Sequence, residues 1–175
     1  AVPLTLQPGS PWETLSGNQI GALLSDYVCS QFKKLGKLNP RSFLVTTLVT
    51  TKLTSRIAES YGVRSESNLH VGFKWIAGAM DEFGADDFVF GTEESHGYLI
   101  GQYVRDKDGA AGTLLMAQLI AQLKSEGKTA HQRLDELFKQ HGCHQETLVN
   151  VQMEGSEGMA LMRKLMEAFR KSPPT

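Results

Sequence analysis

The sequence has no excess of one charge, few cysteines and no long apolar run. It carries 18 Lys and Arg residues against 19 Asp and Glu residues, so it lacks the basic surface that binding to nucleic acid or to an anionic membrane requires. No apolar run approaches the roughly 20 residues of a transmembrane helix. Two cysteines, Cys29 and Cys143, do not form a disulfide framework, and we expect both to be reduced.

The remaining composition is ordinary for a globular chain. With 175 residues, of which 41% are hydrophobic, the chain is long enough for one domain or two small ones. It contains no internal repeat and no low-complexity segment. Its first residues lack the basic region and apolar stretch of a signal peptide, and we expect a cytoplasmic location.

Short β-rich runs alternate with amphipathic stretches along the chain. We expect strands near 43–50, 67–71 and 87–91, with helices between and after them. A further short strand is expected near Leu148, before a helix that carries a methionine-rich face. This order predicts an α/β fold, a three-layer α/β/α domain with a mixed, mainly parallel sheet.

Capping motifs mark two of the predicted helices. Ser16 with Gln19, and Thr129 with Gln132, have the spacing of a capping box. Four leucines of the helix predicted over 110–126 are expected to face inward. They are Leu114, Leu115, Leu119 and Leu123.

Most residues of chemical interest follow the third predicted strand. Phe88 to Phe90 are apolar and Gly91 ends the run, so the polar segment after it should emerge at the carboxyl end of the strand, where open α/β sheets bind ligands. Glu93 and Glu94 are neighbours, and neighbours on an extended segment point to opposite sides. We therefore expect only one of them to face a ligand.

Glu93 and Ser95 should lie on the same side and could bind adjacent hydroxyls of a sugar. The segment from Arg105 to Gly109 then places Arg105 and Lys107 before a helix, whose amino end favours a phosphate group. Together these features indicate a sugar phosphate as ligand. The alternative is that the segment is a solvated turn with compensating charges.

A second chemical alternative is hydrolysis of a carbohydrate by Glu93 or Glu94. That reaction needs another carboxylate about 5 to 9.5 Å away across the scissile bond. The candidates near in sequence are Asp86, Asp87 and Asp106.

The segments Thr92–Gly97 and Arg105–Gly109 resemble, in order and spacing, the sugar-recognition loop and the following charged turn of the phosphohexomutases, the phosphoglucomutase and phosphomannomutase family. Val71 to Lys74 is similar to a further junction of that family, at which the backbone of Gly72 and the side chain of Lys74 approach the substrate. Ser16-Gly-Asn18 is similar to a motif that follows the family's metal-binding loop.

The resemblance implies a parent enzyme that interconverts hexose 1-phosphate and hexose 6-phosphate through a phosphoserine and a bisphosphorylated sugar. It implies that Glu93 and Ser95 hold two sugar hydroxyls and that Lys107 and Lys74 contact sugar or phosphate. Arg105 is a further candidate, although we expect it chiefly to shape the turn.

The resemblance also implies a division of the chain. Residues 1–41 would be the end of the family's second domain and a linker, 42–142 its third, sugar-recognition domain, and 143–175 a hinge and the start of its fourth. The family's phosphoserine loop, its three-aspartate Mg²⁺ loop and its phosphate loop have no counterpart in the sequence. We therefore expect no catalytic residue and no metal ligand in this chain, which alone should be inactive. The missing domains would be its partners, and glucose or mannose bisphosphate the activator. The alternative is a stand-alone, non-catalytic module that binds sugar phosphates.

Overall fold

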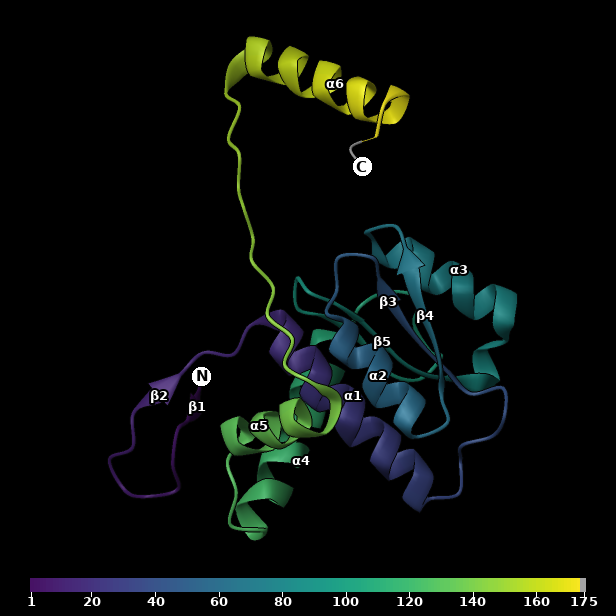
Figure 1. Ribbon diagram of the computed structural model, residues 1–175. Helices are drawn as coiled ribbons and strands as arrows, with labels where there is room; N and C mark the ends of the chain where they lie inside the picture. The colour runs from purple at the N-terminus through teal and green to yellow at the C-terminus, as the bar shows by residue number, and fades with distance from the viewer. Residues whose placement is uncertain (174–175) are drawn as a thin grey trace. The chain divides into compact units, whose positions relative to one another are not determined.

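The computed structural model describes residues 1–173 and divides into two compact units, residues 1–145 and 146–175, each considered by itself (Figure 1). Pro174 and Thr175, the end of the segment predicted over 143–175, lie outside the described residues. The helices are α1 (Gly17–Lys34), α2 (Lys52–Ser60), α3 (Phe73–Phe83), the 3₁₀ turn η1 (Ala85–Asp87), α4 (Gly109–Ser125), α5 (Ala130–His141) and α6 (Gly155–Lys171). The strands are β1 (Val2–Pro3), β2 (Trp12–Glu13), β3 (Phe43–Thr47), β4 (Arg64–Leu69), β5 (Phe88–Glu93) and β6 (Gly97–Leu99).

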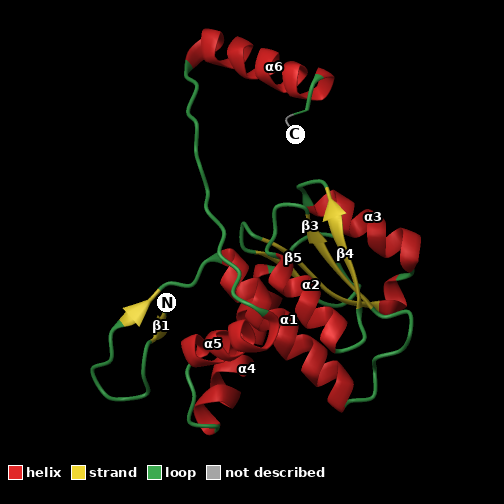
Figure 2. Ribbon diagram, viewed as in Figure 1, coloured by secondary structure: helices red, strands yellow, loops and turns green. Residues whose placement is uncertain are grey.

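A four-stranded sheet in the order β4-β3-β5-β6 forms the centre of the first unit (Figure 2). Strands β4 and β5 pair in parallel with β3, and β6 pairs antiparallel with β5. The predicted mixed, mainly parallel sheet is therefore confirmed. The parallel strands all end at one edge of the sheet, at Thr47, Leu69 and Glu93.

Helices cover both faces of this sheet, as the predicted three layers require. On one face, Phe73, Ile76 and Met80 of α3 pack with Phe43 and Phe88 of the strands. On the other face, α1 and α2 supply apolar side chains to a core with Leu44 and Phe90. Helices α4 and α5 extend that second layer by packing on α1 and α2 (Figure 1).

Both predicted capping boxes are confirmed. The Gln19 N–H donates to Ser16 Oγ at 3.2 Å, and the Ser16 N–H donates to Gln19 Oε1 at 2.8 Å. Thr129 and Gln132 make the same pair of bonds at the start of α5. These caps satisfy amide groups that a helix start leaves without a partner.

The strand boundaries differ from the prediction in ways that matter for the site. Strand β3 ends at Thr47 rather than residue 50, because Leu48 and Val49 turn outward and are exposed. Strand β5 continues to Glu93, which therefore belongs to the sheet rather than to a loop. Strand β4 begins at Arg64 and is polar and partly exposed, so apolar content did not reveal its start.

The short strand β6 was not predicted. Gly97 pairs with Glu93 and Leu99 pairs with Gly91, so the polar segment Glu94–His96 is the turn of a tight β-hairpin. The segment expected to be a polar loop is thus flanked by two paired strands of the sheet, β5 and β6.

Two further predictions are wrong. Leu119 and Leu123 of α4 are buried as expected, but Leu114 is 60% exposed. No strand forms at Leu148, and the backbone from Gly142 to Glu154 lacks regular structure until α6 begins at Gly155. Strand formation needs a neighbouring strand, and within the described residues of this segment there is none.

Helix α6 is the only helix of the second unit as far as the structure describes it. It has no buried residue, and its large apolar side chains, which include Met162, Met166 and Phe169, are exposed. Glu157 lies in its first turn and Arg170 and Lys171 in its last, which suits the helix dipole.

Helix α1, predicted to belong to a preceding domain, packs here within the same compact unit as the sheet. Leu15, Leu23 and Leu24 are buried against residues of α2, α5 and β3. The structure therefore shows no division near residue 41, and the assignment of segments to domains of a longer protein stays a prediction.

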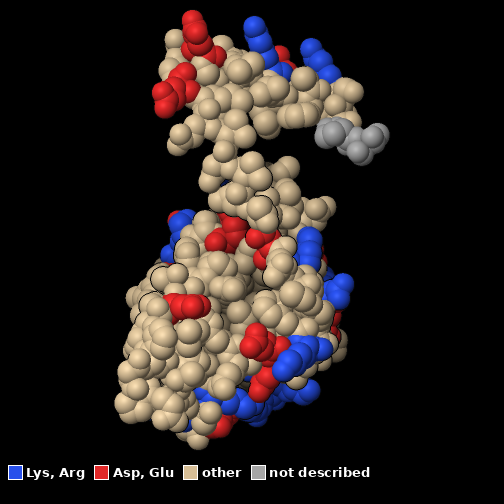
Figure 3. Space-filling model, turned by 60° about the vertical axis from the view of Figure 1, so that its left-hand side comes forward, with Lys and Arg blue, Asp and Glu red and all other residues tan. Residues whose placement is uncertain are grey.

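Charged side chains of both signs are interspersed on the face shown in Figure 3. Over residues 1–173, no helix combines the length and the apolarity that crossing a membrane would need.

Candidate functional site

Four segments meet at the carboxyl edge of the sheet. They are the turns that follow β3, β4 and β5, and the amino end of α1, which contacts the first and the third of these turns. Ligands of open α/β sheets bind at this edge. It is also where the structure places Gly72, Glu93 and Ser95, three of the residues singled out in the sequence.

Glu93, the last residue of β5, is held firmly in this edge. Its side chain is 4% exposed, and its Oε1 accepts the N–H of Gly72 at 2.8 Å. Its Oε2 lies 3.1 Å from the point that a Cβ on Gly97 would occupy, and that point is also only 2.7 Å from the ring of Phe73. Gly72, Phe73 and Gly97 thus surround one carboxylate, of which Oε1 has a protein partner.

Glu94 points the other way, as its neighbouring position predicted. Its Oε2 accepts from Thr50 Oγ1 at 3.5 Å, on the turn after β3, whereas Glu93 contacts the turn after β4. Thr50 itself pairs with Thr47 at 2.9 Å. The two carboxylates therefore do not converge on a common point.

Ser95 and His96 form the exposed tip of the hairpin. Ser95 is exposed, which leaves its hydroxyl accessible to a ligand. His96 has a φ of 63°, a conformation that costs a residue with a Cβ about 1 kcal/mol or more. The His96 ring approaches the Tyr98 hydroxyl at 3.3 Å, and this contact holds the strained residue in place.

The amino end of α1 supports the hairpin, a role that the sequence did not reveal. A Cβ on Gly17 would lie 1.9 Å from the carbonyl oxygen of Glu94, so the helix touches the hairpin backbone directly. Asn18 Oδ1 accepts the N–H of Thr51 at 3.0 Å, which fixes the turn after β3. The only signal in the sequence was the resemblance of Ser16-Gly-Asn18 to a family motif.

The charged turn is only partly directed at this site. Lys107 Nζ lies 5.2 Å from the centre of the Phe73 ring and 3.3 Å from Asp106 Oδ1, which brings Lys107 close to the surroundings of Glu93. Arg105 instead pairs with Asp81 of α3 at 3.3 Å. Its guanidinium therefore contacts α3, and the role of Arg105 at the site stays a prediction.

The start of α4 is already occupied by a carboxylate. Asp108 accepts the N–H of Ala111 at 3.0 Å and the hydroxyl hydrogen of Tyr103. These bonds lower the pKa of Asp108, the Tyr103 bond being the largest cause. A phosphate at this helix end, which the sequence predicts, would have to displace the Asp108 carboxylate.

Gly72 and Lys74 occupy the turn between β4 and α3. Gly72 has a φ of 121°, which side chains rarely permit, and its N–H is the one that Glu93 accepts. Lys74 is exposed and its Nζ lies 5.3 Å from the centre of the Trp75 ring.

Two of the carboxylates considered for hydrolysis lie at the opposite edge. Asp86 and Asp87 precede β5, whose six residues span about 17 Å between Phe88 and Glu93. Asp87 is paired with Arg41 at 3.0 Å, and Asp86 accepts from Gln102 at 2.9 Å. Asp106 accepts a hydrogen bond from the backbone N–H of Lys107, and this bond is the largest cause of the lowered pKa of Asp106.

Within residues 1–173, no three His, Cys, Asp or Glu side chains are arranged to hold a metal ion. The residues present therefore do not fit the Mg²⁺ that the family resemblance implies.

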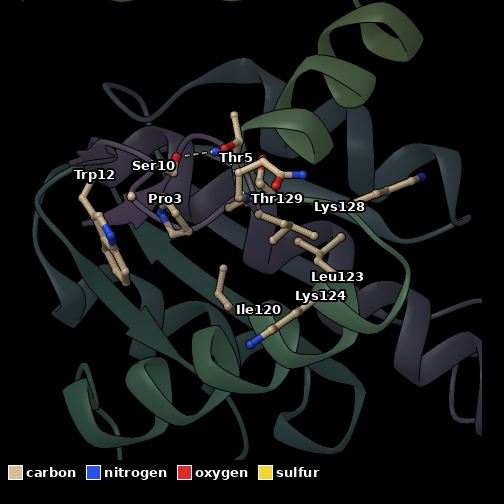
Figure 4. A pocket seen from close by; sticks show the side chains of 13 residues that line it. Pro3, Thr5, Ser10, Trp12, Ile120, Leu123, Lys124, Lys128 and Thr129 are labelled. Carbon is tan, nitrogen blue, oxygen red and sulfur yellow. Dashed lines mark hydrogen bonds between the residues drawn. The ribbon is translucent and has the colours of Figure 1, made fainter.

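A separate cleft of about 410 Å³ lies between the β1–β2 hairpin and helices α4 and α5 (Figure 4). Pro3 and Trp12 line it on one side, and Ile120, Leu123 and Lys124 on the other. None of the residues predicted to bind substrate contributes to it.

These observations define an α/β/α domain with a carboxylate-bearing hairpin at the ligand-binding edge of its sheet. Residues 16–141 match the family model described as phosphoglucomutase/phosphomannomutase, alpha/beta/alpha domain III. The chain therefore belongs to the phosphoglucomutase/phosphomannomutase family.

Curated relatives are longer than this chain. It is 34% identical over 161 residues to a phosphoglucomutase of Staphylococcus epidermidis, covering 91% of this chain and 29% of that protein. It is 34% identical over 162 residues to a phosphoglucomutase of Staphylococcus aureus, covering 91% of this chain and 28% of that protein. The chain thus spans less than a third of these relatives.

Solved structures share the fold. A putative phosphomannomutase from Thermus thermophilus superposes with a TM-score of 0.56 at 25% identity, over 73% of this chain and 26% of that one. The parafusin phosphoglucomutase of Paramecium superposes with a TM-score of 0.56 at 18% identity, over 74% of this chain and 21% of that one. The second likeness concerns the fold alone.

Proposed function

We propose that this chain is the sugar-recognition part of a phosphohexomutase, which interconverts hexose 1-phosphate and hexose 6-phosphate through a phosphoserine and a bisphosphorylated sugar. The observation that carries the proposal is the placement of Glu93 at the carboxyl edge of the sheet, with Oε1 fixed by Gly72. A carboxylate oxygen that is held in place can accept a sugar hydroxyl without first losing conformational freedom. The names of the Staphylococcus relatives support the same reaction class.

In this proposal Glu93 Oε2 and the Ser95 hydroxyl bind two adjacent sugar hydroxyls. The hairpin fixes their spacing because Glu93 is paired with Gly97 across the turn. A mutase of this kind must bind its sugar in two orientations, and one rigid pair of polar groups can hold an equivalent pair of hydroxyls in both. Lys107, beside Phe73, is placed to contact the sugar or its phosphate.

The remaining parts of the reaction would come from outside this chain. Phosphoryl transfer depends on positioning and on neutralising the charge of the transferring group. A Mg²⁺ ion would be held by residues of other domains, which would also supply the phosphoserine. The chain alone is therefore expected to be inactive, with glucose or mannose bisphosphate as activator of a cytoplasmic, full-length parent.

The test is a nuclear magnetic resonance titration of the ¹⁵N-labelled chain with glucose 1-phosphate and, separately, with glucose 6-phosphate. The proposal predicts that both isomers shift the amide signals of Gly72 and Glu93–Gly97, and that they compete. Glu93→Gln should lose at least about tenfold in affinity for both isomers, since one charged hydrogen bond is worth roughly 1.5 to 3 kcal/mol.

Glu94→Gln is the matched control, because Glu94 contacts Thr50 instead of the turn at Gly72. It should leave the affinity within about twofold, well under the 1.4 kcal/mol of a tenfold change. Equal affinities of wild type and Glu93→Gln would remove the role given to Glu93.

The stand-alone binding module remains the alternative function. Weighing the intact native protein in its source cells separates the two. A chain roughly three times longer, in keeping with the share of the relatives covered here, supports the mutase. A native mass near 19.3 kDa supports the module.

A further inference from the structure

The cleft of Figure 4 has one wall made by the β1–β2 hairpin. Pro3 and Trp12 are paired across the two strands, so their side chains stand on the same face of the hairpin. Val2 packs against the buried core of the helices, and the hydroxyl of Thr129 donates to the carbonyl oxygen of Leu4 at 3.4 Å. These contacts hold the hairpin against α4 and α5, so the wall is a fixed part of the first unit.

The indole of Trp12 is open on the side of the cleft. Trp12 is 67% exposed, and within residues 1–173 no second aromatic ring and no cation packs over its indole. In Figure 4, Trp12 and Ile120 stand on opposite sides of the cleft. The volume of about 410 Å³ lies in the range of roughly 300 to 1,000 Å³ that small-molecule pockets occupy. The cleft therefore has room for a ligand with an apolar body.

The charge of this cleft is of one sign. Among the residues that the structure describes, Lys124 and Lys128 are the only charged ones that line it. Lys128 pairs with Glu136 at 2.7 Å, whereas Lys124 makes no ion pair with any of residues 1–173. The cleft thus offers one uncompensated ammonium group, which matches a singly charged carboxylate better than a doubly charged phosphate.

The loop between β1 and β2 adds polar groups to the lining. Thr5, Gln7 and Ser10 face the cleft from the hairpin, and the loop is ordered by the Thr5 N–H, which donates to Ser10 Oγ at 2.8 Å. Pockets for small ligands commonly combine apolar walls with a few polar groups that fix the orientation of the ligand. This cleft has both components.

We propose that the cleft is a binding site for a small carboxylic acid with an aromatic body. The ring of the ligand packs between the Trp12 indole and Ile120, and its carboxylate binds the Lys124 ammonium. An exposed indole favours an aromatic partner, because ring pairs add to the gain from burying their area. The inference is independent of the proposed function, since neither Glu93 nor Ser95 lines this cleft.

The experiment is a nuclear magnetic resonance titration of the full ¹⁵N-labelled 175-residue chain with 4-phenylbutyrate. The indole N–H signal of Trp12 and the amide signals of Gln7, Ser10 and Ala130 should shift and reach saturation at millimolar concentration. The chain has two tryptophans, so Trp75→Phe identifies which indole signal belongs to Trp12. The Trp75 signal should stay in place, because Trp75 lies on α3 and does not line the cleft.

A neutral analogue and four variants separate the two parts of the site. The amide 4-phenylbutanamide should bind about threefold more weakly than the acid, as expected for one exposed ion pair. Lys124→Gln should weaken the acid by about threefold and leave the amide unchanged. Trp12→Ala should weaken both ligands by about tenfold, and Trp12→Phe should recover most of the loss because an aromatic ring remains. Lys139→Gln, at an exposed position of α5, is the control and should bind as wild type does.

Three results would overturn the inference. Signals of the cleft that do not shift at millimolar concentration, or shifts confined to the exposed apolar residues of α6, would show that the cleft is not the site. Equal affinities for the acid and the amide would remove the carboxylate from the recognised chemistry. Displacement of 4-phenylbutyrate by glucose 1-phosphate would place the acid at the carboxyl edge of the sheet instead of the cleft.

Discussion

Replacing Gly17 by alanine should force α1 away from the hairpin that carries Glu93. Alanine is favoured over glycine inside a helix by about 1 kcal/mol, so an unhindered exchange would stabilise the protein. At Gly17, however, the new Cβ would lie 1.9 Å from the carbonyl oxygen of Glu94 and 3.0 Å from the amide nitrogen of His96. Backbone atoms cannot rotate out of the way, and overpacking costs about 1 to 3 kcal/mol or more. The expected net loss is about 2 kcal/mol.

Two other helical glycines provide matched controls. A Cβ on Gly78 of α3 would meet nothing within 4 Å, so Gly78→Ala should gain about 0.5 to 1 kcal/mol. A Cβ on Gly21 of α1 would lie 3.0 Å from Thr92 Oγ1, a side-chain atom that can shift by tenths of an ångström. Gly21→Ala should therefore be close to neutral.

Urea unfolding followed by circular dichroism measures the three variants. The midpoint should rise for Gly78→Ala, stay for Gly21→Ala and fall for Gly17→Ala, with an unchanged slope for all. Gly17→Ala should also weaken binding of glucose 1-phosphate, since it displaces the hairpin. A Gly17→Ala midpoint at or above that of wild type would refute the claim that α1 supports this hairpin.

Three further predictions concern residues away from the site. Cys143 is exposed, whereas Cys29 is buried and its burial raises the pKa of its thiol to about 12. A thiol reagent should therefore label Cys143 at once and Cys29 only after unfolding, as measured by mass spectrometry of the peptides. Arg133→Leu should destabilise the chain by roughly 3 kcal/mol in urea unfolding, because it removes the guanidinium whose Nη2 lies 2.8 Å from Oδ2 of the buried Asp26. Adding Asp26→Asn to this variant should recover part of the loss. Hydrogen bonds from Lys128 and Arg133 lower the pKa of Glu136 below its ordinary value of 4.5, so the stabilisation they give is complete above that pH and is lost as the pH falls through the lowered value. Glu136→Gln should abolish this part of the loss of stability in acid, and an unchanged dependence of stability on acid pH would contradict the prediction.

The parts of the fold that could be predicted are those encoded locally. Phe43 to Val45 and Phe88 to Phe90 are apolar, and all but Leu44 are β-branched or aromatic, which identifies buried strands from the sequence alone. Capping by Ser16 and Thr129 depends on residues three apart, and such signals need no knowledge of the rest of the chain.

The parts that could not be predicted depend on contacts between distant segments. Strand β4 is polar because it lies at a sheet edge, so its sequence gives no apolar signal before Leu69. Leu114 has the spacing of an inward residue, but the direction that a helix faces depends on what packs against it. The strand predicted near Leu148 failed for the same reason, since it found no neighbour to pair with.

The site shows the same contrast. Glu93 and Glu94 contact different turns, as expected for neighbours, although Glu94 lies in the hairpin turn and not on an extended strand. The bond from Gly72 to Glu93 joins residues 21 positions apart, and the contact of Gly17 with Glu94 joins residues farther apart still. The spacing of residues in the sequence predicts neither contact, and it does not predict the ion pair between Arg105 and Asp81.

Strand β4 also determines how this unit behaves at high concentration. As an edge strand it offers unpaired backbone groups to any other strand, which is the usual route to aggregation. Arg64 and Glu66, paired at 2.8 Å, place charge along it, and the register shift opposite Val45–Thr47 bends its pairing. Lys52 Nζ donates a hydrogen bond to the carbonyl oxygen of Ser67 at 3.1 Å. The strand of a second chain would therefore have to pair with a charged and irregular edge. The same polar residues that gave no strand signal in the sequence of β4 thus also hinder extension of the sheet into fibrils.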